Sequence, residues 1–199
     1  DALPISKAAK VKIKRERLTL DMWRAIHARA RTDWLKRAME LALITGQRRD
    51  DIASMLFKDE QDGYLHVVQK KTGQRLRLST AIGLQCIDLD LAGVIRLCRD
   101  NVVSKHLIHH PRTISRAKAG SPIVLDTISK AFADARDAAA EAGEITLTDS
   151  PPTFHEMRSL AARLHDAEGR DAQALLGHKS ARMTELYRDS RGAEWIDVA

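Results

Sequence analysis

The sequence predicts a mainly helical α+β domain that contains a β-hairpin. Apolar residues recur at helical spacing after Thr19 and again after Asp33, and a third helical stretch, Ala131–Ala142, is rich in alanine. Between these helices, residues 63–78 alternate on either side of Thr72-Gly73, which is typical of two strands joined by a turn. Helices therefore dominate the predicted fold, and the strands contribute one antiparallel pair.

Length and composition exclude several classes of protein. A chain of 199 residues fits one domain with an extension and can bury a sizeable core. Cys86 and Cys98 lie in apolar surroundings at a spacing that suits neither a disulfide framework nor a metal site, so we expect two buried thiols. No apolar run approaches the length of a membrane span, and the first residues lack a secretory pattern. These features predict a cytoplasmic protein.

Basic charge is concentrated at the start of the chain. The net charge is +6, and residues 1–17, with six basic and two acidic side chains, carry +4 of it. Such a segment is typical either of a linker that follows a polyanion or of a solvated, disordered tail. We expect a basic interdomain linker over residues 1–17. Because the chain begins with Asp rather than Met, we also expect a fragment whose preceding domain is missing.

The first two predicted helices end close to a candidate functional arginine. Thr19 can cap the first helix and Asp33 the second, and Gly46 is expected to end the second in a left-handed turn. Asp50 or Asp51 would then open a short helix that runs through Met55-Leu56. Arg48 therefore lies at a helix junction, from which a side chain is easily directed into a cleft.

The middle of the chain is predicted in less detail. Lys71 stands just ahead of the hairpin turn, and residues 82–98 contain enough apolar side chains for one or two helices. Residues 105–109 are expected to form a short strand. Thr127 or Ser129 can cap the alanine-rich helix, which Gly143 would end.

Three histidines in this region raise the question of a metal site. His106, His109 and His110 are close in sequence, but no carboxylate or cysteine lies at a convincing ligand spacing. We therefore favour a strand that alternates between solvent and core, and we expect no metal or cofactor.

The segment after Pro151-Pro152 holds the strongest local signal. Thr153 and Glu156 match a capping box that would start a helix at a fixed point. His155 and Arg158 are three residues apart, so we expect them to project from one face of this helix. A helix N-terminus also offers unpaired amides and a positive dipole end, which together suit an anion such as a phosphate.

A potential nucleophile follows this segment. Gly177 is expected to end a short helix and to deliver His178 to a turn. Tyr187 lies nine residues further on, and Tyr64 in the predicted hairpin is the other tyrosine of the chain. A phenolic nucleophile would therefore be Tyr187, whereas the alternative is an amphipathic tyrosine half-buried against the domain.

Together these motifs resemble the catalytic domain of the tyrosine recombinases, and most closely the lambda-type phage integrases. The resemblance covers roughly residues 15–197. The basic lead-in and residues 101–120 depart from the family pattern. Five segments carry the resemblance in order, namely Thr45-Gly46-Gln47-Arg48, Lys71-Thr72-Gly73, Thr153 to Leu160, Leu176-Gly177-His178-Lys179-Ser180 and Tyr187-Arg188-Asp189.

The resemblance implies a mainly α fold with a small antiparallel β-sheet and a set of functional residues. Residues 18–188 would be the catalytic domain, and residues 189–199 a tail that packs in cis or on a neighbouring protomer. The implied roles are as follows: Arg48 and Arg158 grip the scissile phosphate, His155 and His178 hydrogen-bond to it, Lys71 protonates the departing 5′ oxygen, Tyr187 attacks phosphorus, and Asp51 braces the site.

The resemblance also implies partners and leaves alternatives. The expected partners are double-stranded DNA, three further copies of the chain in a homo-tetramer on DNA, and DNA-bending accessory proteins, with a monomer away from DNA. Site-specific recombination through a 3′-phosphotyrosine is the implied function. A type IB topoisomerase or a telomere resolvase would use much the same residues, and a non-catalytic DNA-binding module would explain the charge alone.

Overall fold

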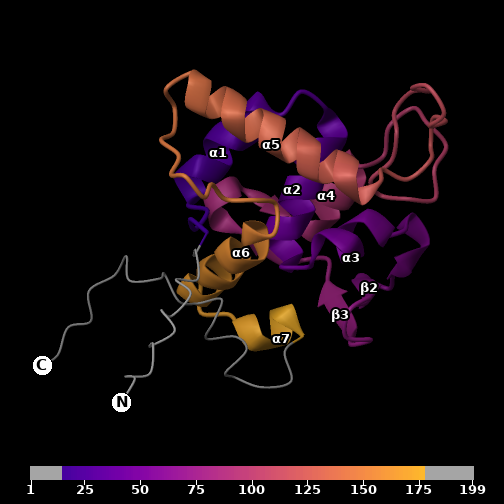
Figure 1. Ribbon diagram of the computed structural model, residues 1–199. Helices are drawn as coiled ribbons and strands as arrows, with labels where there is room; N and C mark the ends of the chain where they lie inside the picture. The colour runs from indigo at the N-terminus through magenta and orange to yellow at the C-terminus, as the bar shows by residue number, and fades with distance from the viewer. Residues whose placement is uncertain (1–14, 178–199) are drawn as a thin grey trace, which may run out of the picture.

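The computed structural model describes residues 15–177 and confirms a mainly helical domain with small antiparallel sheets (Figure 1). None of its helices is long and apolar enough to cross a lipid bilayer. The elements, in chain order, are α1 (Leu20–Arg29), α2 (Asp33–Thr45), α3 (Arg49–Ser54), the 3₁₀ turn η1 (Phe57–Asp59), β1 (Glu60–Gln61), β2 (Tyr64–Val68), β3 (Arg75–Ser79), β4 (Gly83–Leu84), the 3₁₀ turn η2 (Gln85–Ile87), β5 (Leu89–Asp90), α4 (Leu91–Leu97), α5 (Leu125–Glu141), α6 (Glu156–Ala167) and α7 (Ala172–Leu176).

Helix α2 forms the centre of the core. It packs against α3, α4, α5 and α6, and its last eight residues, 38–45, are all buried. Figure 1 shows α5 and α1 side by side above α2, with α6 and α7 below it. Because α2 ends at Thr45, the core helix carries the chain directly to Arg48.

Local signals at the helix ends are largely confirmed. The Thr19 hydroxyl caps α1 by accepting a hydrogen bond from the Met22 amide at 3.2 Å. Gly46 ends α2 with a φ of 64°, and a Cβ at this position would lie 2.9 Å from a methyl group of Leu176. Gly46 is therefore required both by its left-handed backbone and by the close approach of α7.

The predicted hairpin is confirmed. Strands β2 and β3 pair antiparallel, with Leu65 opposite Leu78 and Val68 opposite Arg75, and β1 adds a short third strand beside β2. Residues 70–73 form the connection, which is closed by a hydrogen bond from the Gln69 amide to the Gln74 carbonyl at 2.9 Å. This connection fixes the position of Lys71 relative to the sheet.

Several predicted helix starts are wrong by a few residues. Thr32 rather than Asp33 is the N-cap of α2, and Arg48 rather than Asp50 or Asp51 precedes α3, which ends at Ser54. Helix α5 begins at Leu125, before both predicted caps. In each case the observed N-cap (Thr32, Arg48 or Val124) lies one to five residues before the predicted one and makes no side-chain capping hydrogen bond, so these helix starts do not depend on the capping side chains that the prediction used.

Two predicted segments take a different form. Residues 82–98 contain one helix, α4, preceded by the two-stranded sheet β4–β5, because Asp88 adopts a left-handed φ of 51° and the Asp90 carboxylate caps α4. Residues 105–109 form no strand and make only isolated bridges, at His106 and His109. His109 and His110 are both buried, so the predicted alternation is also wrong.

The two cysteines are free and lie at different depths. Cys98 is buried, and this burial raises the pKa of its thiol to about 12. Cys86 is only half-buried, so the prediction of two buried thiols holds for Cys98 alone.

Candidate active site

A basic cleft of about 500 Å³ lies where α3, the β2–β3 connection, α5 and the segment before α6 meet. Three of the predicted site residues line it together: Arg48, Lys71 and His155. Further cations on its walls are Arg15, Arg49 and Arg136, and among the residues that the structure describes Asp50 is the one acidic side chain there. The cleft is therefore suited to a polyanion.

Arg48 is positioned by the sharp turn between α2 and α3. Its backbone amide donates to a carboxylate oxygen of Asp51 at 3.3 Å, and its Nη1 donates to the side-chain oxygen of Gln69 at 3.3 Å. The first bond fixes the backbone and the second holds the guanidinium toward the hairpin. Arg48 thus has a defined direction at the wall of the cleft.

Asp51 ties the start of α3 to the hairpin connection. Its carboxylate is 1% exposed and accepts hydrogen bonds from the backbone amides of Arg48 and Lys70, the latter at 2.8 Å. Lys71 is the next residue along the chain. One buried carboxylate therefore sets the separation between the arginine and the lysine that face the cleft.

Two buried glutamines, which the sequence analysis did not assign to the site, connect its parts. The Gln69 amide nitrogen donates to the Gln47 side-chain oxygen at 2.7 Å and to the Leu176 carbonyl at 2.9 Å. Its oxygen accepts from Arg48 and, at 2.7 Å, from the Thr72 hydroxyl. The Gln69 side-chain amide thereby links Arg48, the hairpin connection and the end of α7, and both its nitrogen and its oxygen make two hydrogen bonds.

Gln47 extends this network. Its amide nitrogen donates to the carbonyls of Thr45 at 2.8 Å and Leu175 at 2.9 Å. Gln69 follows the inward-facing residues Leu65 and Val67 at a spacing of two. A polar side chain at an inward strand position must find hydrogen-bond partners, and this was the signal that could have identified it.

Arg158 lies behind the cleft rather than on its wall. Its side chain is among the largest that are fully buried, and its two Nη nitrogens donate to the carbonyls of Gly46 and Leu176, both at 2.6 Å. One guanidinium thus joins the end of α2 to the end of α7. His155 faces the cleft, so the two residues predicted on one helix face lie at different depths.

Helix α6 starts differently from the prediction. It begins at Glu156 with His155 as its N-cap, and no side chain caps it, so the predicted capping box is wrong. The Glu156 carboxylate instead forms a buried ion pair with Arg17 at 3.0 Å, and the Thr153 hydroxyl accepts a hydrogen bond from Arg15 at 3.1 Å. Arg15 and Arg17, at the end of the basic lead-in, therefore bind the two side chains that were predicted to form the capping box. These contacts hold the segment that carries His155.

The surroundings of His155 favour its neutral form. Desolvation by neighbouring groups is the largest influence and lowers the pKa of the ring, Glu156 opposes it, and the cations Arg158, Arg48 and Lys71 lower it further. The imidazole is therefore neutral near neutral pH and can accept a proton. It lines the cleft, so a reacting group bound there could supply that proton.

His178 and Tyr187 lie outside the described residues. The last described residue is Gly177, which ends α7 with a φ of 63° as predicted. Asp171 caps the same helix by accepting from the amides of Gln173 and Ala174. Arg158 and Gln69 both donate to the Leu176 carbonyl, so the last described residue, Gly177, directly follows a residue that is anchored beside the cleft.

The fold and the cleft have the character of a tyrosine recombinase catalytic domain, and comparison with known proteins agrees. A sequence model described as the phage integrase family matches residues 16–194, so the chain belongs to the phage integrase family. It is 42% identical to the prophage integrase IntE of Escherichia coli K12 over 98% of this chain and 52% of that protein. It is 41% identical to the integrase of enterobacteria phage P21 over 97% of this chain and 50% of that protein.

The fold of this chain is also similar to solved structures of lambda integrase. A lambda integrase dimer bound to a COC′ core site superimposes with a TM-score of 0.85 at 38% identity, covering 98% of this chain and 53% of that one. The lambda integrase catalytic core superimposes with a TM-score of 0.73 at 36% identity, covering 83% of this chain and 96% of that one. The chain spans about half the length of the curated relatives it matches. The predicted family resemblance and fold class are confirmed.

Proposed function

We propose that this chain is the catalytic part of a site-specific DNA recombinase, which breaks and rejoins DNA through a 3′-phosphotyrosine. The observation that carries the proposal is the basic cleft, which Arg48, Lys71 and His155 line together. Beside it, Gln69 and Arg158 hold the end of α7 by hydrogen bonds to the Leu176 carbonyl. The similarity to lambda integrase bound to a core site supports double-stranded DNA as the substrate. We assign the catalytic domain to residues 18–188.

The charges of the cleft suit phosphoryl transfer. In-line attack on a phosphodiester gathers negative charge on the two non-bridging oxygens, and planar guanidinium groups pair with such oxygens better than ammonium groups do. Arg48 on the wall and Arg158 behind it supply two fixed positive charges. Because arginine stays protonated at any relevant pH, neither arginine can act as the general acid, and Lys71 takes that role.

The proposed reaction balances without an external energy source. The Tyr187 oxygen bonds to phosphorus and loses its proton to a general base, for which His155 is our candidate and His178 the alternative. The bond from phosphorus to the 5′ oxygen breaks, and Lys71 gives that oxygen a proton. Because the phosphotyrosine conserves the energy of the broken bond, the same steps in reverse reseal a strand.

The proposed assembly rests on relatives. A lambda integrase tetramer bound to a Holliday junction superimposes on this chain with a TM-score of 0.85 at 37% identity, covering 98% of this chain and 54% of that one. We propose that this protein also acts as a homo-tetramer on DNA in the bacterial cytoplasm, with its residues 189–199 packing in cis or on a neighbouring protomer. DNA-bending accessory proteins would complete such a complex.

The proposed function is tested by identifying the covalent bond. The 199-residue chain is incubated with a nicked suicide duplex in EDTA and digested, and peptide masses are measured. We expect nucleotide mass on the peptide that contains Tyr187, at a yield that added magnesium does not change. If no adduct forms, the remaining interpretation is a non-catalytic DNA-binding module. If the protein relaxes supercoiled DNA without pairing two sites, it is a topoisomerase. An adduct that requires magnesium would contradict the mechanism.

The role of Lys71 predicts a chemical rescue. Lys71→Ala should slow cleavage of ordinary DNA by about 10²–10⁴-fold, the usual contribution of a general acid. A substrate with sulfur at the 5′ bridging position should restore the rate, because a thiolate leaves without a proton. Lys70→Ala is the matched control, since the neighbouring lysine is equally exposed and does not line the cleft. Absence of rescue would remove Lys71 from the role.

The lowered pKa of His155 predicts the pH dependence of cleavage. The neutral, proton-accepting ring becomes populated as pH rises through its pKa, which lies below the ordinary value of about 6.5. We therefore expect the adduct-forming rate to rise with pH in the acid range and to level off below pH 6.5. His155→Gln should lose this acid limb and react about 10²–10⁴-fold more slowly. If the rate of His155→Gln still rises with pH in the acid range, the general base is another group, such as His178.

A further inference from the structure

The connection between α4 and α5 carries a hairpin that projects from the body of the domain beside the start of α5 (Figure 1). We call residues 111–119 the basic finger. Its tip is closed by two hydrogen bonds between Ile114 and Ala117, of 2.9 and 3.0 Å, around Ser115, which has a left-handed φ of 54°. The finger is therefore a formed hairpin.

The finger carries an unbalanced charge. Arg112, Arg116 and Lys118 are all exposed, and Lys105 at its foot is exposed as well. The sequence contains no acidic residue from position 101 to position 125. None of these four cations forms an ion pair in the part of the chain that the structure describes. A surface of this kind attracts a polyanion.

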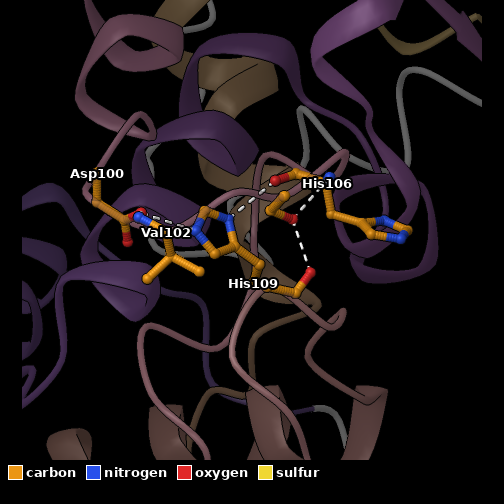
Figure 2. A network of polar contacts seen from close by, with 6 residues as sticks. Asp100, Val102, His106 and His109 are labelled. Atoms are coloured by element: carbon orange, nitrogen blue, oxygen red, sulfur yellow. Dashed lines mark hydrogen bonds and ion pairs between the residues drawn. The ribbon is translucent and has the colours of Figure 1, made fainter.

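Partly buried polar contacts hold the base of the finger. Figure 2 shows the His109 ring between the Asp100 carboxylate and the His106 carbonyl, at 3.1 and 2.9 Å. The Ser104 hydroxyl donates to the Gly120 carbonyl at 2.8 Å, and a Cβ on Gly120 would lie 2.4 Å from the Val103 carbonyl oxygen. Of the three histidines that raised the question of a metal site, His109 supplies its ring and His106 its backbone carbonyl to the contacts at the base of the finger.

The finger is followed along the chain by a helix that lines the cleft. Residues 120–124 lead from the finger into α5, and α5 contributes Ser129, Phe132 and Ala133 to the lining of the cleft. A duplex that occupies the cleft and continues past the start of α5 would therefore pass the finger. About half to two-thirds of protein–DNA hydrogen bonds go to phosphates and sugars, and arginine and lysine are prominent among their donors, so the phosphate backbone is the expected partner of these cations.

We propose that the basic finger binds the phosphate backbone of DNA that flanks the cleaved site. This inference rests on the proposed function, because it takes the cleft as the place where DNA is cut. The contact would add affinity that is independent of base sequence, at a segment where the chain departs from the pattern of its family. Arg112, Arg116 and Lys118 would each neutralise one phosphate.

The test is the salt dependence of DNA binding. The affinity of the 199-residue chain for a duplex is measured between 50 and 200 mM salt for the native protein and for R112Q/R116Q/K118Q. Each lost phosphate contact lowers the slope of log affinity against log salt by about 0.9, so the triple variant should lose about 2–3 units of slope. An unchanged slope would overturn the proposal.

Matched controls separate the finger from general charge. R31Q/K58Q/R96Q removes three exposed cations that form no ion pair in the described part of the chain and do not line the cleft, and it should keep the native slope if the effect belongs to the finger. On a duplex shortened on the finger side, the native protein and the finger variant should bind equally. Gly120→Ala keeps every charge but displaces the base, so it should reproduce part of the loss. An equal loss in the control triple variant would overturn the proposal.

The failure of this proposal is distinguishable from failure of the proposed function. If the adduct forms at Tyr187 and the slope does not depend on the finger, only the finger assignment is wrong. If no adduct forms while the finger variant loses slope, the finger binds DNA and the catalytic proposal is wrong.

Discussion

Tyr187→Phe should abolish the covalent complex with DNA and leave DNA affinity within about twofold of the native value. The substitution removes one oxygen, which the proposed mechanism uses as the nucleophile, and keeps the aromatic ring. No other group replaces an attacking oxygen at the same position, so the loss should be complete rather than partial. Denaturing gels of a suicide substrate measure the adduct, and filter binding measures the affinity.

Tyr64→Phe is the matched control for this prediction. Tyr64 is the other tyrosine of the chain, and its ring lies under the Arg77 guanidinium at 4.4 Å in the β2–β3 hairpin. Loss of its hydroxyl should leave the adduct unchanged, since the stacking contact needs only the ring. Adduct that survives in Tyr187→Phe would remove Tyr187 from the role, and loss of adduct in both variants would point to a defect in folding.

Elements whose cause is local could be predicted from the sequence. The Thr19 cap, the left-handed turns at Gly46 and Gly177, and the connection ending at Gly73 each depend on a few neighbouring residues. These turns place Arg48 and Lys71 at exposed junctions. The approach of both residues to one cleft followed from the family resemblance, because spacing alone does not specify which junctions meet.

Features that depend on distant contacts could not be predicted in the same way. The capping box failed because Arg17, 139 positions away in the chain, takes the Glu156 carboxylate. The depth of Arg158 depends on two carbonyls, of Gly46 and Leu176, that belong to other helices. The Gln47–Gln69 contact similarly joins residues 22 positions apart. Spacing on one helix or strand does not contain this information.

Arg158→Lys should cost both stability and activity. The guanidinium donates from separate nitrogens to the carbonyls of Gly46 and Leu176, and a single ammonium cannot reproduce a fork of this width. A buried carbonyl left without a partner costs about 1–3 kcal/mol, so the free energy of unfolding should fall by at least that amount. We propose that Arg158 also donates to the scissile phosphate once DNA fills the cleft, and on that proposal cleavage should slow by about 10²–10³-fold, the usual effect of losing one donor to a developing oxyanion.

Arg163→Lys is the matched control for Arg158→Lys. Arg163 also lies on α6 and also donates to a backbone carbonyl, that of Leu18, at 2.6 Å. Unlike Arg158, Arg163 has a backbone partner that lies before α1 and not at the ends of α2 and α7 that flank the cleft. Its replacement should lower stability without a comparable loss of rate per bound complex. The comparison is made by urea unfolding together with single-turnover cleavage at saturating DNA. If both variants lose stability and neither loses rate, Arg158 only joins α2 to α7, and the phosphate must be gripped by Arg48 and the other cations of the cleft.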